Sequence, residues 1–251
     1  METKKIIITG GATRIGKAIA LELADYNTQI VIHYSKSFSA AKKLKKDLEN
    51  LGSIVHLIKA DLNNYKQTQK IISYAHKKMK GLNCLVNNAS VFENDNLYNF
   101  SNVSFLKHIN INLKAPAILT RDFSKIYKGK DGNIVNIIDQ RVEKLTPFFL
   151  SYTLSKSGMV TLTKTSAMKL APNIRVNAIS PGPTLKNKRQ SEIHFKKQWR
   201  STILRKKVET KNISSTVKFL INNSNITGQV INVDSGQRLA WKTPDIINAK
   251  E

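Results

Sequence analysis

The sequence predicts an α/β protein with one doubly wound, mainly parallel sheet covered by helices on both faces. Three observations predict this fold. Short β-branched runs alternate with longer stretches of helical periodicity along the chain. The first run leads directly into a glycine turn and a helix, and no linker rich in Gly, Ser or Pro divides the chain. Strands joined by helices in this way form parallel sheets buried on both faces, so residues 1–251 are expected to form a single domain.

The two periodicities assign the elements in chain order. The β-branched and apolar runs predict strands at Lys4–Thr9, Gln29–Tyr34, Ser53–Ile58, Leu82–Asn87, Asn133–Ile138, Ile174–Ile179 and Gln229–Val233. Spacings of three and four predict helices at Ile15–Ala24, Phe38–Leu51, Tyr65–Met79, around Val103–Tyr127 and at Ser151–Leu170. In the last helix, the core candidates are Leu154, Met159, Leu162 and Met168. The segment from Pro181 to Lys207 is basic and lacks β periodicity, and an excursion of this length is usually functional or mobile.

The charge of the chain is unusual, with 41 Lys and Arg against 17 Asp and Glu, a formal net charge of +24. Such a charge raises nucleic acid, an anionic membrane or an anionic ligand as partners. The lysines are spread along the chain without interleaved aromatic residues, and a bias towards Lys, Asn and Ile explains them as readily. We therefore expect no nucleic-acid partner.

Several other classes of protein are also excluded by composition. No stretch of about 18 apolar residues is present, which argues against a membrane span. The single cysteine, Cys84, cannot form an internal disulfide, and the apolar run after Met1 is too short for a signal peptide. The five histidines show no metal-ligand spacing, so no metal is expected. These features predict a soluble cytoplasmic protein.

The turn Thr9-Gly10-Gly11-Ala12-Thr13-Arg14-Ile15-Gly16 lies between the first strand and the first helix. This is the context that a dinucleotide-binding turn requires. Glycines let the backbone approach a pyrophosphate, whose charge the helix N-terminus favours. The alternative is a glycine turn that only joins a strand to a helix. The candidate cofactor residues in this turn are Gly10, Thr13, Arg14, Ile15 and Gly16.

The end of the second strand favours NADPH over NADH. Folds specific for NAD usually place an acidic residue there, which binds the ribose 2′-hydroxyl. This chain instead has His33, Tyr34, Ser35, Lys36 and Ser37. With Arg14 nearby, these donors and cations suit a 2′-phosphate. The alternative is a solvated polar loop.

Five motifs stand in one order along the chain: the Thr9–Gly16 turn, Asp61-Leu62, Asn87-Asn88-Ala89-Ser90, Tyr152-Thr153-Leu154-Ser155-Lys156 and Pro181-Gly182. In this succession and spacing, the sequence resembles the short-chain dehydrogenase/reductase family over nearly its whole length. The resemblance implies a Rossmann-like fold, an NADP-dependent oxidoreductase and a homotetramer. It also implies further cofactor residues: Asp61, Leu62, Asn88, Ala89, Ser90, Tyr152, Lys156, Pro181 and Gly182.

The spacing of Tyr152 and Lys156 has a chemical reason. Positions four apart share a helix face, with Cβ atoms about 5 to 6 Å apart. A nearby ammonium favours phenolate and should lower the tyrosine pKa from about 10, which suits a proton donor. In the family the lysine also holds the nicotinamide ribose, and an asparagine maintains a proton-relay water. Asn112 is the best match for that asparagine.

One position departs from the usual family pattern. Members that reduce ordinary carbonyls carry a serine thirteen residues before the tyrosine, where this chain has Asp139. A carboxylate there would repel a developing alkoxide, but it could hydrogen-bond the ring nitrogens of a pterin or activate the tyrosine as an acid. A salt bridge from Asp139 to Arg141 or another cation is the structural alternative.

The aspartate is typical of the pteridine reductase and dihydromonapterin reductase subgroup. That subgroup also has an arginine in its glycine loop, like Arg14, a His-Tyr segment like His33-Tyr34, and Asn-Ala-Ser-x-Phe, which matches residues 88–92. The resemblance implies that Phe92 stacks on the pterin and that Arg14 and Ser90 contact cofactor phosphate and substrate. The predicted substrate residues are Arg14, Ser90, Phe92, Asp139 and Tyr152.

The substrate loop, residues 183–207, carries no motif that we can interpret chemically. Its basic and aromatic residues either attract an anionic substrate tail, such as the glutamate of a folate, or form a solvated basic face: Lys186, Lys188, Arg189, His194, Lys196, Lys197, Trp199 and Arg200. The leading hypothesis is an NADPH-dependent reductase of pterins, dihydropterins or dihydrofolate, with Tyr152 as proton donor. The alternatives are a 3-oxoacyl-type carbonyl reductase and a non-catalytic protein that senses dinucleotides or binds nucleic acid.

Overall fold

A seven-stranded parallel sheet forms the centre of the molecule. The computed structural model describes residues 3–187 and 189–241. The strand order is β3-β2-β1-β4-β5-β6-β7, and every neighbouring pair is parallel. The chain first winds from β1 towards β3 and then returns to the other side of β1. This reversal next to β1 makes the sheet doubly wound, as in Rossmann-like folds, and the fold prediction is confirmed.

The elements lie close to their predicted positions. The strands are β1 Lys4–Ile8, β2 Thr28–Tyr34, β3 Ile54–Lys59, β4 Cys84–Asn87, β5 Gly132–Ile137, β6 Ile174–Pro181 and β7 Val230–Val233. The helices are α1 Arg14–Leu23, α2 Phe38–Asn50, α3 Tyr65–Thr68, α4 Lys70–Met79, α5 Asn102–Ile109, α6 Ala115–Ile126, α7 Leu150–Leu170, α8 Glu192–Arg200 and α9 Thr210–Asn222. Three short helices, η1 Asn110–Lys114, η2 Gln140–Val142 and η3 Gln237–Leu239, complete the described structure.

Two helices were not predicted from the sequence. Helix α9 is rich in Ser, Thr and Asn, which are poor helix formers, and only Ile213, Val217 and Leu220 mark its buried stripe. Helix α8 begins at the cap Ser191 and buries a single apolar side chain, Phe195. The poor helix formers of α9 and the single buried apolar side chain of α8 therefore hid these helices from the sequence pattern.

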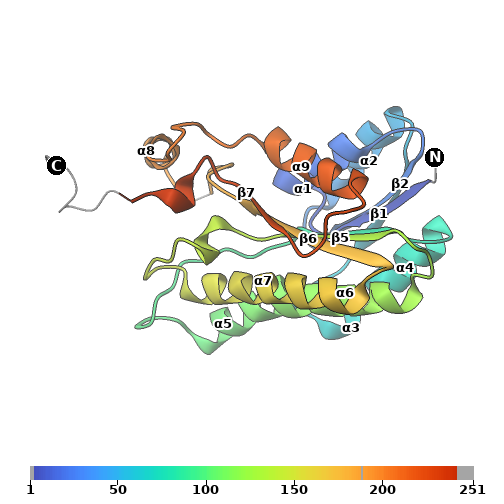
Figure 1. Cartoon of the computed structure of the whole chain (residues 1–251), viewed down its shortest axis with the longest axis horizontal. Helices are drawn as coiled ribbons and strands as arrows, with labels where there is room; N and C mark the ends of the chain where they lie inside the picture. Colours follow the sequence, from blue (N-terminus) through green and yellow to red (C-terminus); the bar gives the residue numbers. More distant parts are fainter. Residues whose placement is uncertain (1–2, 188, 242–251) are drawn as a thin grey trace, which may run out of the picture.

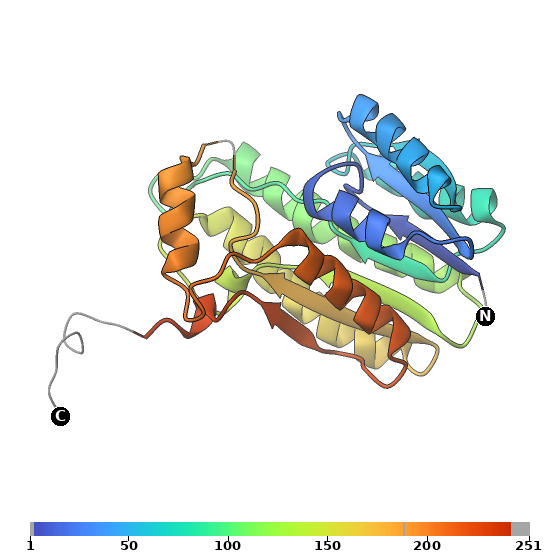
Figure 2. The same ribbon diagram turned by 90° about the horizontal axis from the view of Figure 1, so that it is seen from above.

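Helices cover both faces of the sheet. Helices α1, α2 and α9 lie on one face, and α4, α5, α6 and α7 lie on the other, while α8 stands apart beyond the sheet (Figures 1 and 2). Successive side chains of β1 point to opposite faces of the sheet, so β1 contributes to both cores. Ile6 and Ile8 pack with α1 and α9, and Ile7 packs with α4 and α6. All three isoleucines are fully buried, as expected for a central parallel strand.

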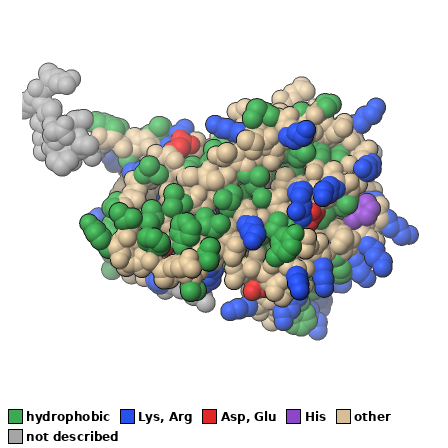
Figure 3. Space-filling model, turned by 90° about the horizontal axis from the view of Figure 1, so that it is seen from below, with side chains coloured by type: hydrophobic (Ala, Val, Ile, Leu, Met, Phe, Trp, Pro, Cys, Tyr) green, Lys and Arg blue, Asp and Glu red, His purple; other side chains and the backbone are tan. Residues whose placement is uncertain are grey.

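The predicted core positions of α7 are partly wrong. Met159 is buried and Leu162 is partly buried, but Leu154 and Met168 are 48% and 74% exposed. The reason is that α7 turns Tyr152, Ser155 and Lys156 inward, so its inner face is largely polar. Apolar side chains consequently gather on the outer face of the layer that contains α5 and α7, which Figure 3 views directly. None of the described helices is long and apolar enough to cross a membrane.

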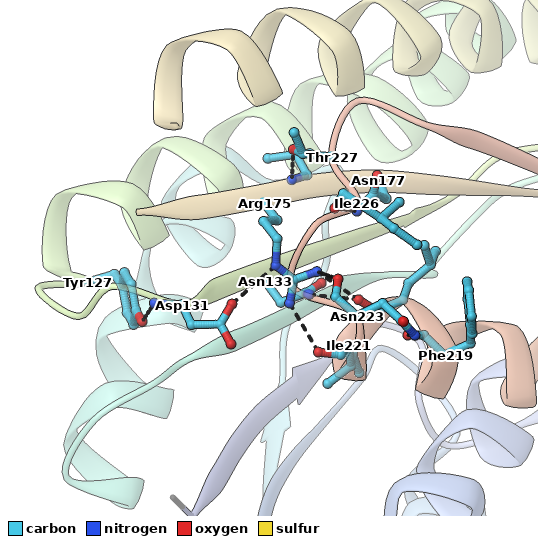
Figure 4. A network of polar contacts seen from close by, with 12 residues as sticks. Tyr127, Asp131, Asn133, Arg175, Asn177, Phe219, Ile221, Asn223, Ile226 and Thr227 are labelled. Atoms are coloured by element: carbon cyan, nitrogen blue, oxygen red, sulfur yellow. Dashed lines mark hydrogen bonds and ion pairs between the residues drawn. The ribbon is translucent and has the colours of Figure 1, made fainter. Parts of the chain in front are cut away.

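Arg175 fastens α9 to the sheet at the amino end of β6. Its guanidinium donates to the backbone carbonyls of Leu220, Ile221 and Asn223 at 2.7 to 3.0 Å, and to Asp131 at 3.1 Å (Figure 4). The last carbonyls of a helix lack partners within the helix, so this buried arginine satisfies them. The network lies at the amino ends of the strands and leaves the opposite edge of the sheet to the cavity described next.

Candidate active site

A cavity of about 800 Å³ opens at the carboxyl ends of the strands. Ligands of open α/β sheets bind at this edge, where the strand order reverses. Most of the predicted site residues line it: Gly10, Thr13, Arg14, Ile15, Gly16, His33, Ser35, Asp61, Leu62, Asn88, Ala89, Ser90, Phe92, Asp139, Tyr152, Lys156, Pro181 and Gly182. Asn112 lies beneath the cavity, and Tyr34 and Lys36 line a neighbouring hollow of about 480 Å³. Ser37 lines neither and precedes α2.

The glycine turn lets α1 begin close to the end of β4. Gly10 has φ +59°, and a Cβ atom there would lie 2.9 Å from the Cα atom of Ala89. Asn88 donates to the carbonyls of Thr9 and Gly10 at 2.9 and 3.1 Å. The N-cap of α1, Thr13, makes no side-chain capping bond, and the first turn of α1 holds no acid. The positive end of α1 thus faces the cavity without an internal anion, which fits a phosphate.

His33 has a structural role that the sequence did not predict. Its Nδ1 atom accepts the N–H of Gly10 at 3.1 Å, so its Nε2 atom carries the proton and donates to the carbonyl of Ala60 at 3.1 Å. Burial lowers the pKa of His33 to about 4. The expectation that His33 offers a cation or free donor to a 2′-phosphate is therefore wrong, because both ring nitrogens already hold the glycine turn to the sheet.

The remaining candidates for the phosphate end are exposed. Ser35, Lys36 and Ser37 follow β2 at the surface. Tyr34 is buried, and its ring lies 5.8 Å from that of Phe38. Arg14 directs its guanidinium to the carbonyls of Leu185 and Lys186, both at 3.1 Å, and so connects the glycine turn to the substrate loop.

The three reactive groups predicted from the sequence meet at the other end of the cavity. The Tyr152 hydroxyl donates to Oδ2 of Asp139 at 2.9 Å, and Oδ1 of Asp139 accepts the backbone N–H of Arg141 at 2.9 Å. Lys156 donates to the carbonyl of Ile137 at 2.8 Å, and its Nζ lies 5.8 Å from the centre of the Tyr152 ring. Asp139 thus binds the tyrosine, and no salt bridge from it to Arg141 is found among the described residues.

The electrostatics of this group differ from the expectation. Burial, together with the charge and hydrogen bond of Asp139, raises the pKa of Tyr152 well above 10. The predicted lowering by Lys156 is therefore wrong here, because burial of the phenol and the neighbouring Asp139 carboxylate both raise its pKa. Burial also raises the pKa of Asp139 and lowers that of Lys156 to about 8. The result is a tyrosine that keeps its proton beside a carboxyl group able to take one up.

Asn112 holds the segments around the reactive groups together. It lies in η1, a π-helical turn between α5 and α6. Its amide donates to the carbonyl of Val91 and to Ser155, and its oxygen accepts the N–H of Val91 and the hydroxyl of Ser90. These four bonds fix the loop after β4 against α7. The predicted proton-relay water at Asn112 stays a prediction.

Phe92 and Phe149 form an aromatic wall beside Tyr152. The two rings stack with centres 4.4 Å apart and planes 4° apart, and the centre of the Tyr152 ring lies 4.6 Å from that of Phe92 with the two planes 73° apart. The Arg141 guanidinium lies 4.5 Å from the Phe149 ring. Phe149 lines the cavity but is not predicted from the sequence, because a single aromatic residue before a helix carries no signal.

A second missed residue, Asp95, caps the helix that carries Tyr152. Phe149 precedes α7 with φ +61° and provides no side-chain cap. The backbone carbonyl of Asp95 accepts the N–H groups of Phe149 and Leu150, and its Oδ1 atom accepts that of Ser151 at 3.1 Å. Asp95 is 3% exposed. The absence of a capping residue type before Leu150 was the one sequence signal that α7 needs a distant cap.

The comparisons with known proteins agree with this geometry. Residues 4–198 match the family model described as short chain dehydrogenase. The 3-oxoacyl-[acyl-carrier-protein] reductase FabG of Buchnera aphidicola is 33% identical over 242 residues, covering 93% of this chain and 97% of that protein. The dihydromonapterin reductase of an Enterobacter species is 23% identical over 239 residues, covering 94% and 97%.

Solved structures give a similar result. FolM alternative dihydrofolate reductase 1 from Brucella suis, in complex with NADP, is 40% identical with a TM-score of 0.92, covering 97% of this chain and 98% of that one. The Brucella canis protein of the same name, also with NADP, is 40% identical with a TM-score of 0.91, covering 96% of both chains. With its family model, its doubly wound sheet and the Tyr152–Lys156 helix at the cavity, the chain belongs to the short-chain dehydrogenase family and is an oxidoreductase.

Proposed function

We propose that this chain is an NADPH-dependent reductase of a pterin, dihydropterin or dihydrofolate, with Tyr152 as the proton donor. NADPH, when bound, supplies a hydride. The observation that carries the proposal is the 2.9 Å hydrogen bond from Tyr152 to Asp139, at the position where the family resemblance implies serine in members that reduce ordinary carbonyls. The two FolM structures and the dihydromonapterin reductase are consistent with such a substrate.

The nucleotide end of the cavity has a donor set that fits NADPH. The uncapped N-terminus of α1 suits the pyrophosphate. Ser35, Lys36 and Ser37 offer hydroxyls and an ammonium to a 2′-phosphate and place no acid after β2. Both FolM relatives were crystallised with NADP. Lys156 would hold the nicotinamide ribose.

The residues of this chain move one proton in the reduction. Tyr152 gives its hydroxyl proton, directly or through water, to a ring nitrogen of the substrate as that nitrogen gains electron density. The phenolate then takes up a proton from solvent water, and Asp139, which accepts the Tyr152 hydroxyl and whose pKa is raised by burial, is the nearest group able to relay that proton. The ammonium of Lys156 stabilises the phenolate while it lasts. Because Tyr152 and Asp139 share one hydrogen bond, they should titrate as a pair.

The aromatic wall would orient a flat substrate. Phe92 presents a ring beside Tyr152, and its own position is fixed by Phe149. Offset stacking of a pterin on such a ring is favourable and leaves the ring nitrogens at the edge for hydrogen bonding. Two further residues that line the cavity would contact the substrate: Arg14 from the glycine turn and Ser90 from the loop after β4.

A carbonyl reductase for 3-oxoacyl thioesters is the second candidate, favoured by the FabG relative. The charge of Asp139 opposes it, because a carboxylate next to a developing alkoxide raises the barrier. The Asp139→Ser variant separates the two functions. If the wild type ignored pterins and the variant gained ketone reduction, the carbonyl reductase would be correct.

The direct test is a substrate panel. NADPH oxidation is followed with dihydromonapterin, 7,8-dihydrobiopterin, dihydrofolate and a 3-oxoacyl thioester, each repeated with NADH. We expect turnover of at least one pterin substrate, with NADPH preferred. The proposal is wrong if none of the three pterins is turned over above background.

The assembly and the compartment are part of the same proposal. The exposed apolar residues of α5 and α7, among them Val103, Leu106 and Leu154, suit a homotetramer built across this face. The cytoplasm is the proposed compartment.

A further inference from the structure

The mouth of the cavity contains a cation that the proposed reaction does not use. Six basic side chains line the cavity: Arg14, His33, Arg141, Lys156, Arg189 and His194. Arg14 is bound to two carbonyls of the substrate loop, and Lys156 to that of Ile137. Arg141 packs on Phe149 and donates to Thr146 at 3.0 Å. Arg189 therefore has the least committed charge among the described arginines and lysines that line the cavity.

The structure holds Arg189 in place from its backbone. Its N–H donates to Oδ1 of Asn187 at 2.9 Å, and the next side chain, Gln190, donates to Gln198 on α8 at 2.9 Å. Its Nη2 donates to the carbonyl of Phe92 at 2.8 Å, which brings the guanidinium across the cavity to the loop with the predicted stacking ring. A guanidinium has five N–H donors, and one bond to Phe92 leaves the others available.

The other cations of the substrate loop are placed differently. Lys186 is paired with Glu192 at 2.7 Å. Lys196, Lys197 and Arg200 are exposed on α8 and do not line the cavity, and Lys188 lies outside the described residues. Among the described residues, Arg189 has no carboxylate within ion-pair distance. The two sequence-based alternatives for this segment thus divide between its residues, since Lys196, Lys197 and Arg200 form a solvated basic face while Arg189 and His194 line the cavity.

The acidic groups of the cavity lie elsewhere. Asp139 is bound to Tyr152 at the reaction end. Asp61 follows β3 and also lines the hollow with Tyr34 and Lys36, at the nucleotide end. The described part of the cavity mouth therefore has positive charge without a compensating acid. The planar guanidinium of Arg189 can bind a carboxylate through two parallel hydrogen bonds.

We propose that Arg189 binds a carboxylate on the tail of the substrate and so makes the site selective for pterins with an anionic tail, the dihydrofolate class, over pterins with a neutral side chain. This inference rests on the proposed function and deepens it. The ring of the substrate would lie at Phe92 and its tail would leave the cavity past Arg189. Because Arg189 is exposed, its pair with the tail acts mainly on substrate affinity and weakens with ionic strength.

The test compares dihydrofolate with its diamide, in which neutral amides replace both glutamate carboxylates at nearly the same size. The measured quantity is the KM of the diamide divided by that of dihydrofolate. We expect this ratio to be about 10 in the wild type, the value typical of one charge-assisted contact. In Arg189→Gln, which removes the charge but keeps an amide for the carbonyl of Phe92, the ratio should fall to about 1. The ratio for Arg189→Lys should lie between these two values.

Lys196→Gln is the matched control, since it removes one positive charge from the same segment outside the cavity. Its ratio should equal that of the wild type. The inference is overturned if the ratio is unchanged in Arg189→Gln, if it is near 1 in the wild type, or if the variant instead raises the KM for NADPH. If 7,8-dihydrobiopterin is turned over but the KM ratio is the same in Arg189→Gln as in the wild type, this inference alone is overturned. No turnover of any pterin would overturn the proposed function and this inference with it.

Discussion

The two ends of the cavity are built in different ways. At the reaction end, Asp139, Tyr152, Lys156 and Asn112 are bound to each other, to backbone groups or to the hydroxyls of Ser90 and Ser155 at 2.8 to 3.3 Å. At the nucleotide end, Ser35, Lys36 and Ser37 are exposed on a loop, and the buried His33 is occupied by backbone partners. The first end is preorganised by the protein itself, and the second end presents exposed donors and a helix terminus.

This difference has a consequence for function. A proton donor must be held in one geometry before the substrate arrives, and buried hydrogen bonds provide that rigidity. Phosphate groups carry their own charge and many acceptors, so exposed side chains and a helix N-terminus are enough to bind them. Substitutions at the reaction end should therefore change rate, and those at the nucleotide end should change affinity.

The largest effect is expected for Tyr152→Phe. This change removes the donor hydroxyl and leaves the ring that meets Phe92. We expect kcat for a dihydropterin to fall about 1000-fold, within the range for loss of a general acid. The KM for NADPH should stay within about twofold, because no nucleotide-end residue changes. A variant that kept a tenth of the wild-type kcat would show that Tyr152 is not the donor.

The next effect concerns stability and the role of His33. Its folded pKa of about 4 is below the usual 6.5, so the unfolded chain takes up a proton first as the pH falls. The free energy of unfolding that this residue contributes is present above pH 6.5 and is lost between about 6.5 and 4. Between pH 7.5 and 5.0 the wild type should lose about 2 kcal/mol more than His33→Gln.

Urea unfolding at the two pH values measures this loss. His76→Gln, at an exposed position on α4, serves as the control and should behave like the wild type. Equal losses in His33→Gln and the wild type would mean that His33 does not titrate differently on folding, and its place beneath the glycine turn would need another explanation.

The sequence predicted the fold and most of the cavity because both depend on local patterns. β-branched runs gave the strands, and the Tyr152–Lys156 spacing placed two reactive groups on one face of α7. The sequence could not predict which contact dominates when several are available. Lys156 is four residues from Tyr152, but burial in the folded protein, together with Asp139 from the end of β5, raises the tyrosine pKa.

The sequence could not show which partners are contacted by residues that act across the fold. Asp95 caps α7 from 56 residues away, and Arg189 reaches Phe92 from 97 residues away. The sequence showed that His33 lies at the end of a strand, which favoured a phosphate ligand. It could not show that both ring nitrogens bind backbone groups of Gly10 and Ala60. Contacts of this kind depend on tertiary structure.

The role of Asp95 can be tested by its effect on the reaction end. Asp95→Ala removes the side-chain cap of α7, and we expect kcat to fall about tenfold, with a loss of about 1 kcal/mol in the free energy of unfolding. Asp95→Asn keeps the Oδ1 acceptor and should restore most of the rate. Asn96→Ala is the control, since it loses a turn bond to Tyr98 in the same loop without touching α7. If kcat fell in the same proportion to the loss of free energy of unfolding in all three variants, a positioning role for Asp95 would be contradicted.

The smallest effect is expected at the nucleotide end. Lys36 is exposed, and a single exposed ion pair contributes less than about 1 kcal/mol. Lys36→Gln should therefore raise the KM for NADPH about fivefold, leave the KM for NADH unchanged and leave kcat unchanged. The effect should fade as salt is added, because the charge is screened. Lys42→Gln, on α2 but outside both hollows, is the matched control. An equal rise for both nucleotides would indicate that Lys36 stabilises the loop after β2, and the 2′-phosphate would then have to be bound by Ser35, Ser37 or Arg14.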